Sequence, residues 1–179
     1  MKNLKWLVYL VLLSVTVGGC KTQNSPQGGD EEILDYASHQ IGLQLAEIAK
    51  SGKVLNPRTI EKDGTTAYID REDWTSGFFP GTLWYLYEMN GNEAVKEYAV
   101  QITESLDSVK FLTWHHDVGF MINCSYGNAF RLTGQQEYKE VLIQAARSLC
   151  TRFRPAAGVI QSWDADRGWQ ATRGWKCPV

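Results

Sequence analysis

The chain has 179 residues, a formal net charge of −2 at pH 7 and 44% hydrophobic residues. This composition is that of a globular protein and excludes an intrinsically disordered chain; the charge gives no electrostatic case for nucleic acid as a partner. Seven tryptophans and eight tyrosines stand out, because flat rings with a polar edge can build a core or stack on the faces of sugars. Composition leaves both roles open.

The first 20 residues have the parts of an export signal. Lys2 and Lys5 precede an apolar run of about 12 residues, and two glycines stand directly before Cys20. The run is shorter than the roughly 18–20 residues that span a bilayer. Small residues before a cysteine resemble a bacterial lipobox, so we expect residues 1–20 to be a lipoprotein signal. Cys20 would then anchor the chain by a lipid in the bacterial cell envelope, facing the periplasm or the cell surface. An ordinary cleaved signal with an incidental cysteine is the alternative.

The polar residues 21–30 are typical of a flexible tether, which leaves 31–179 as one domain of ordinary size. From residue 31 to residue 50, apolar residues recur at three- and four-residue spacing, as in an amphipathic helix. We expect helical structure, without a sheet of consequence, from there to residue 152. A loop is expected over residues 155–178.

A pattern of about 43 residues repeats in the middle of the chain. Gly77 and Gly119 each begin a largely apolar helical segment, which ends at Gly91 in the first copy and at Gly134 in the second. The offset is 42 residues at the starting glycines and 43 at the terminal ones. A charged, amphipathic segment follows each terminal glycine. Each copy is therefore predicted to be a helical hairpin with an inner and an outer helix.

Hairpins of this length build all-α folds, either an α/α toroid or an α-solenoid that serves as an interaction module. Periodicity does not separate the two, but a solenoid should end in a polar capping helix, whereas this chain is expected to end in a loop. A closed toroid of six units needs at least ~260 residues, and fewer than three units are present here. We therefore expect a truncated all-α chain of helical hairpins, with the toroid and the solenoid both open at this point.

The segments before the two inner helices contain residues suited to chemistry. Asp117 follows two adjacent histidines, and Asp73 precedes Trp74. Either aspartate could simply cap its helix, and Trp74 could be a core residue or a platform for a sugar. Adjacent histidines rarely converge on one metal, so no metal site is expected. Gly77 and Gly119 are expected to permit close packing of the helices.

Three cysteines follow Cys20, at positions 124, 150 and 177. An odd number without C-x-x-C spacing argues against a disulfide framework or a zinc cluster. Cys124 and Cys150 lie in apolar helical patterns and are expected to be buried thiols.

Four strings occur in one order along the chain: Asp73–Trp84, His116–Phe120, Gly158–Asp164 and Trp175–Val179. Together they resemble the unsaturated glucuronyl hydrolases, glycoside hydrolase family 88. Each string alone is weak evidence for the family. Four strings in the family's order, at compatible spacings and on a matching repeat, are together a fairly specific indication of it.

The resemblance implies an (α/α)6 barrel, so this chain is expected to be a partial (α/α)6 toroid. Such a barrel acts on oligosaccharides left by polysaccharide lyases, which carry a Δ4,5-unsaturated uronic acid at one end. The family hydrates the C4=C5 double bond, and the resulting hemiketal opens and releases the sugar. No metal or organic cofactor is implied.

Site residues follow from the same resemblance. Asp117 matches the family's first catalytic aspartate, and His116 beside it is assigned to substrate binding. Trp74 and Trp163 resemble aromatic residues that line the substrate cleft. The family's second aspartate, the acid/base, follows the last string and would lie beyond Val179, so we expect this chain alone to be an inactive or incomplete fragment.

Two other functions stay open. A lipid-anchored sugar-binding protein would keep the aromatic cleft without catalysis. An unsaturated rhamnogalacturonyl hydrolase would share the barrel and the hydration chemistry, although the His-Asp-Val-Gly-Phe and Gln-Ser-Trp-Asp strings favour glucuronyl substrates.

Overall fold

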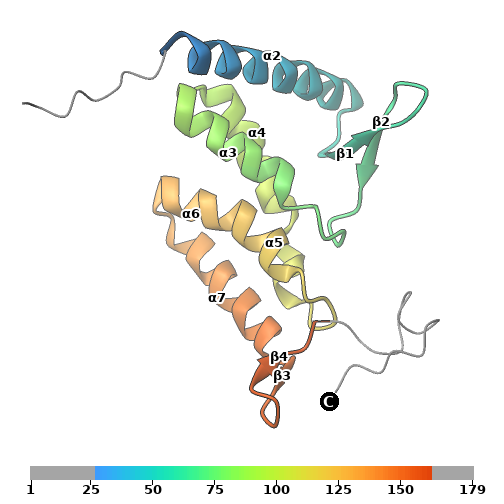
Figure 1. Cartoon of the computed structure of the whole chain (residues 1–179), viewed down its shortest axis with the longest axis vertical. Coiled ribbons are helices and arrows are strands. Elements are labelled where there is room, and N and C mark those ends of the chain that lie inside the picture. Colours follow the sequence, from blue (N-terminus) through green and yellow to red (C-terminus); the bar gives the residue numbers. More distant parts are fainter. Residues whose placement is uncertain (1–26, 163–179) are drawn as a thin grey trace, which may run out of the picture. The chain divides into compact units, whose positions relative to one another are not determined.

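The computed structural model describes residues 27–162 (Figure 1). Cys20, Trp163 and Cys177 lie outside the described residues. One compact unit begins at Leu34 and contains all the described residues except the first turns of helix α2. Within this part of the chain, no helix combines the length and the apolar character needed to cross a membrane.

Helix α2 (Gln27–Ser51) confirms the amphipathic helix expected from residue 31 to residue 50. It begins at Gln27, so the last four residues of the expected tether are helical. Leu45 and Ile48 are its buried hydrophobic side chains, and both belong to the hydrophobic core.

A β-hairpin follows α2, where helix was expected. Strands β1 (Asn56–Ile60) and β2 (Thr66–Ile69) pair antiparallel, so the prediction of helix throughout this region was wrong. Pro57 lacks the amide proton that the interior of a helix needs. Gly64 turns the chain with φ 87°, a backbone angle that glycine adopts without strain.

The hairpin is attached to the loop that leads into the first inner helix. Asn56 Nδ2 donates to the carbonyl of Ser76 at 2.6 Å, and both residues are buried. Arg58 Nη1 lies 2.8 Å from Asp73 Oδ2. These contacts hold the loop that carries Trp74.

The first helical hairpin has the predicted form. Its inner helix, α3 (Phe78–Asn90), stops at Gly91, whose φ of 66° is left-handed, and its outer helix is α4 (Glu93–Ser105). The 3-10 helix η1 (Asp107–Phe111) follows. Figure 1 shows α3 and α4 side by side.

The second hairpin also confirms the repeat. Its inner helix runs through α5 (Val118–Ile122), the π-helical turn η2 (Asn123–Gly127) and α6 (Asn128–Thr133). Gly134, with φ 70°, stops this helix. The outer helix is α7 (Gln136–Cys150).

The hydrophobic core lies between the inner and outer helices. Trp84 of α3 is fully buried, and its Nε1 donates to Thr103 Oγ1 of α4 at 3.0 Å. In the second hairpin Tyr126 packs edge-on against Tyr138 of α7, with ring centroids 5.5 Å apart. Each inner helix is thus fixed to its outer helix by a large aromatic side chain.

The two inner helices approach closely at Gly77. A Cβ on Gly77 would clash with the backbone carbonyl oxygens of Phe120 and Met121, so a residue without a side chain is needed there. The expectation of close packing is confirmed for Gly77. It was wrong for Gly119, where an added Cβ would meet nothing within 4 Å, because that face of α5 points into open space.

The π-helical turn η2 accounts for the unequal offsets of the repeat. The starting glycines lie 42 residues apart and the terminal ones 43, so one residue more lies between the two glycines in the second copy than in the first. A π turn wraps an additional residue into one turn of helix. Helix α3 packs directly against it, because a Cβ on Gly81 would lie 2.8 Å from the carbonyl oxygen of Cys124.

The expected loop after residue 152 begins as a small hairpin. Strands β3 (Phe153–Arg154) and β4 (Val159–Ile160) pair antiparallel, and Gly158 turns the chain with φ 68°. No alternating pattern marks these strands in the sequence, because each has only two residues.

Both described cysteines are free thiols. Cys124 is half-buried, but Cys150 is exposed at the last residue of α7, so the expectation of a buried thiol was wrong for Cys150.

Gly77→Ala is expected to destabilise the fold by about 1–3 kcal/mol, the usual cost of adding a carbon to a packed site. The backbone of Gly77 is right-handed (φ −79°, ψ −16°), so the clash with the Phe120 and Met121 carbonyls is the cause. Denaturant unfolding measures the effect. Gly119→Ala is the matched control and should be neutral or stabilising by up to ~1 kcal/mol, because alanine favours helix over glycine. Equal effects at both positions would contradict the close approach.

Candidate active site

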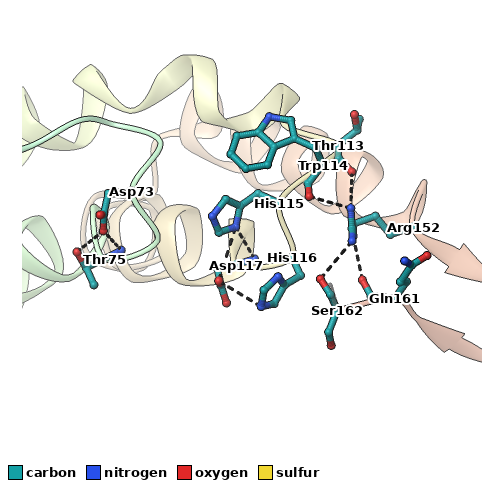
Figure 2. Close-up of polar contacts among 10 residues, drawn as sticks. All are labelled: Asp73, Thr75, Thr113, Trp114, His115, His116, Asp117, Arg152, Gln161 and Ser162. Carbon is teal, nitrogen blue, oxygen red and sulfur yellow. Dashed lines mark hydrogen bonds and ion pairs between the residues drawn. The ribbon is translucent and has the colours of Figure 1, made fainter. Parts of the chain in front are cut away.

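The loop between η1 and α5 carries Trp114, His115, His116 and Asp117 (Figure 2). It leaves η1 at Leu112 in an extended conformation (φ −68°, ψ 120°). The last three of these residues form the His-His-Asp cluster. Their side chains are 16%, 21% and 16% exposed, in chain order, so the cluster is mostly shielded but reachable from solvent.

Asp117 stands at the N-cap position of α5, yet its side chain does not cap the helix. Its backbone carbonyl accepts from the amides of Phe120 and Met121 at 2.8 and 3.2 Å, whereas its carboxylate makes no cap hydrogen bond to the described helix. Oδ2 lies instead 3.3 Å from His116 Nε2. Capping therefore does not explain this carboxylate; a carboxylate of this kind can transfer a proton or stabilise positive charge.

His115 is held as a neutral ring. Its Nδ1 accepts a hydrogen bond from the amide of Asp117 at 3.1 Å, so the ring proton is on Nε2. Burial lowers the pKa of His115 and outweighs the nearby carboxylates of Asp117 and Asp73, which raise it; His116 and Arg152 lower it further. The 3.6 Å separation of Nδ1 and Asp117 Oδ2 is therefore a contact between two acceptors and no ion pair.

By distance alone the cluster could hold a metal ion, because its ligand atoms lie within 4.8 Å of one another. However, the Nδ1 lone pair of His115 is already used by the Asp117 amide. The rings of His115 and His116 are stacked: their centroids lie 5.7 Å apart and their planes form an angle of 21°. The nitrogen lone pairs of two stacked rings lie in nearly parallel planes and do not converge on one point, so the arrangement fits a stacked pair better than a set of metal ligands.

Asp73, four residues before Gly77 in the loop that leads into α3, has a structural role. Its Oδ1 accepts from the amide of Thr75 at 2.9 Å and from the Thr75 hydroxyl at 2.6 Å, and its Oδ2 pairs with Arg58. Burial raises the pKa of Asp73, but the hydrogen bonds from Thr75 and the charge of Arg58 outweigh it and lower the pKa. This aspartate shapes the loop and is ionised.

Trp74, Phe78 and Phe120 form an exposed group of rings, the aromatic platform. Their centroids lie 5.7 to 6.4 Å apart in edge-to-face contacts, and the residues are 43%, 38% and 50% exposed. The amide of Phe120 donates to the carbonyl of Asp117, so the platform begins one helical turn from the cluster. Trp74 is therefore a surface residue beside the candidate site, as a sugar platform requires.

Arg152 joins the loop to the C-terminal hairpin (Figure 2). Its buried guanidinium donates to the carbonyls of Thr113 and Trp114 on the loop and to those of Gln161 and Ser162 after β4. The loop is thus fixed from outside its own segment.

The structure brings together Asp117 and His116, which the motif had paired, and places Trp74 beside them through Phe120. Sequence reasoning missed Phe78, Phe120 and Arg152 as site residues. Both phenylalanines lie inside the motif strings, but an apolar inner helix gives no sign of which ring is exposed. Arg152 carried no signal, because an arginine after an outer helix is normally exposed.

Comparison with known proteins identifies relatives of one kind. No family model matches the chain. An unsaturated glucuronyl hydrolase of Formosa agariphila is 30% identical over 171 residues, which are 93% of this chain and 43% of the relative. One from Bacillus sp. strain GL1 is 36% identical over 130 residues, 69% of this chain and 34% of the relative.

A solved structure, described as an unsaturated glucuronyl hydrolase specific for heparin, superimposes with a TM-score of 0.66 and 40% identity over 75% of this chain and 36% of that structure. The chain thus spans 43% and 34% of the length of the two curated relatives. The prediction of a partial (α/α)6 toroid built of helical hairpins is confirmed. By sequence and by fold, the chain belongs to the unsaturated glucuronyl hydrolase family.

Proposed function

We propose that this chain supplies a catalytic aspartate and part of the sugar-binding surface of a glycosidase that hydrates the C4=C5 double bond of Δ4,5-unsaturated uronyl oligosaccharides. Such oligosaccharides are the products of polysaccharide lyases. The observation that carries the proposal is the carboxylate of Asp117, which stands at a helix N-cap, makes no cap hydrogen bond to α5 and faces His116 at 3.3 Å.

The chemistry needs a negative group at this place. The double bond belongs to an enol ether, because C5 carries the ring oxygen. Protonation at C4 leaves a positive charge shared between C5 and that oxygen, and water then adds at C5 to give the hemiketal that opens. A carboxylate near C5 stabilises this charge, more strongly where water is partly excluded, as it is around the 16% exposed side chain of Asp117. In this scheme the second aspartate that the resemblance implies gives its proton to C4, and its carboxylate then takes one proton from the water that adds at C5.

The neighbouring residues support this role of Asp117. His116 Nε2 is close enough to orient the carboxylate, and His115 stays neutral, so it does not compensate the negative charge. The aromatic platform offers Trp74 and Phe120 to the apolar face of a sugar ring. Charge stabilisation and sugar stacking thus lie within one turn of α5.

Asp117→Asn tests the catalytic role. Turnover is followed as loss of the ultraviolet absorbance of the C4=C5 bond in lyase-derived disaccharides. The assay uses the 179-residue chain and a fusion in which the remaining part of the Formosa agariphila relative follows Val179. We expect turnover by the fusion only, and a fall of at least ~100-fold in its Asp117→Asn variant with the fold intact, the scale of losing one proton-transfer or electrostatic contributor.

Asp73→Asn is the matched control, since asparagine keeps an oxygen for the Thr75 hydrogen bonds and loses only the solvent-accessible ion pair with Arg58, which contributes about 0–1 kcal/mol. Its turnover should stay near that of the parent fusion. Near-parent turnover by Asp117→Asn would remove Asp117 from the mechanism, and disaccharide binding by the fusion without turnover would favour the sugar-binding alternative.

Trp74→Ala should raise KM about tenfold, equivalent to losing ~1.4 kcal/mol of binding, because one ring of the aromatic platform is removed. The ring is 43% exposed, so the melting temperature should change little. Phe111→Ala on η1 is the control, as its side chain is 60% exposed and lies outside the platform. An unchanged KM for Trp74→Ala would exclude this ring from substrate binding.

His115 makes stability depend on pH. Burial lowers its pKa below the ordinary 6.5, so as the pH falls the unfolded chain takes up a proton first and is favoured. The contribution of His115 to stability is present above pH 6.5 and is lost as the pH falls through the lower pKa of the folded state. The melting temperature of the wild-type chain should therefore fall as the pH is lowered from about 7.5 to 5.5. It should fall less in the His115→Asn variant, which keeps an acceptor for the Asp117 amide.

His39→Asn, an exposed position on α2, is the control and should retain the wild-type dependence. A His115→Asn curve parallel to wild type would show that this ring is not the buried, neutral group that the geometry indicates.

A further inference from the structure

Arg152 is a buried charge at the junction of α7 and β3. Only 5% of the residue is exposed. All three guanidinium nitrogens donate to backbone carbonyls: Nη1 to Thr113 at 3.2 Å and Trp114 at 2.8 Å, Nε to Gln161 at 2.9 Å, and Nη2 to Ser162 at 3.2 Å.

These hydrogen bonds join two segments that are distant in sequence. On one side is the loop 113–117, up to 39 residues before Arg152; on the other is the end of the hairpin, residues 161 and 162. Figure 2 shows Arg152 between them, with the His-His-Asp cluster on the same loop. The carbonyl of Trp114 belongs to the peptide bond that leads into His115, so Arg152 fixes the backbone directly before the cluster.

The chemistry of this contact is specific to arginine. A guanidinium presents donors in a rigid, planar fork, whereas the ammonium of lysine is a compact point charge on a flexible stem. One ammonium cannot replace three donor atoms that point to four separate carbonyls. Because a buried charge without hydrogen bonds is strongly unfavourable, the carbonyls on both segments are held at the guanidinium.

Within the loop, the constraint is passed on by short-range contacts. Trp114 packs on the ring of His115 with centroids 4.9 Å apart. His115 Nδ1 accepts from the amide of Asp117, and the carboxylate of Asp117 faces His116. A shift of the Trp114 carbonyl therefore moves the amide and the carboxylate of Asp117 together.

We propose that Arg152 is a positioning residue of the active site: it acts through the loop 113–117 and holds the carboxylate of Asp117 where catalysis requires it. The proposal rests on the proposed function of Asp117. It assigns to Arg152 no contact with substrate.

Arg154, two residues after Arg152 and on β3, offers a matched control. It is half-buried, and its Nε donates to the side chain of Gln161 at 2.8 Å, a contact within the β3–β4 hairpin. Arg154→Lys therefore perturbs the hairpin with the same chemical change as Arg152→Lys. It leaves the carbonyls of Thr113 and Trp114 bound to Arg152.

The first experiment uses the 179-residue chain and needs no turnover. Amide hydrogen exchange is measured by NMR, together with the nitrogen spectrum of the His115 ring. In Arg152→Lys we expect the Asp117 amide to exchange at least ~10-fold faster, as local opening permits, and the His115 Nδ1 signal to move away from that of a hydrogen-bonded acceptor. The amide of Ala99, in the buried core of α4, should keep its rate, as should both reporters in Arg154→Lys.

The second experiment uses the fusion of the activity assay. Arg152→Lys should lower kcat at least ~10-fold and change KM by less than about twofold, because a transition-state contact is displaced while the sugar platform is intact. In the Asp117→Asn background the same change should have little further effect, since residues that act through one another are not additive.

The outcomes separate the proposal from its alternatives. Uniformly faster exchange, including at Ala99, would mean that Arg152 only stabilises the fold, and it would overturn the proposal. Unchanged exchange at the Asp117 amide, or fully additive effects in the double variant, would also overturn it.

If Arg152→Lys does not fold, the exchange of guanidinium protons is measured in the wild-type chain. Slow exchange for Arg152 but not for Arg154 supports the positioning role of Arg152, and fast exchange for both overturns it. If no fusion turns over substrate, the proposed function fails, while the exchange data still decide whether Arg152 holds the loop.

Discussion

The close contact of Gly77 with the backbone of the second inner helix is the constraint on which the candidate site depends. Trp74 stands three residues before Gly77, and Asp117 stands three residues before Phe120, whose carbonyl Gly77 meets. The contact therefore brings the starts of both inner helices to one place. A side chain at Gly77 would force the starts of the two inner helices apart.

In the cluster, the backbone and the side chain of Asp117 have separate roles. The carbonyl of Asp117 starts α5 and its amide fixes the neutral ring of His115, so the backbone is fully used in structure. The carboxylate is left to face His116. Asp73, in the loop that leads into the other inner helix, shows the opposite arrangement, because its carboxylate is bound by Thr75 and Arg58. The two inner helices are thus each preceded by an aspartate, but only the carboxylate of Asp117 is left available for chemistry.

Sequence reasoning succeeded where the information is local. The glycine stops at Gly91 and Gly134 predicted both helical hairpins, because a left-handed residue after an apolar helix is a local requirement. It could not predict that Gly77 packs closely and Gly119 does not, because this difference arises from the approach of a helix distant in sequence. Nor could it predict that the carboxylate of Asp117 is available while that of Asp73 is bound, because this depends on side-chain rotamers. The β1–β2 hairpin was missed because its strands are short and carry no clean alternation, and Arg152 because its burial depends on residues far along the chain.

The π-helical turn η2 has a consequence for how this sequence can vary. Each residue of an α-helix rotates the following chain by ~100°, so a residue added to a regular helix would turn everything after it. A π turn takes up such a residue within a single turn, so η2 keeps the two ends of the second inner helix in nearly the phase of a regular helix one residue shorter. Loss of one codon between Asn123 and Gly127 would therefore give a regular helix in which the His-His-Asp cluster still faces the same side of α7. Loss of one codon elsewhere in α5 or α6 would instead turn the cluster by about 100° relative to α7 and Arg152.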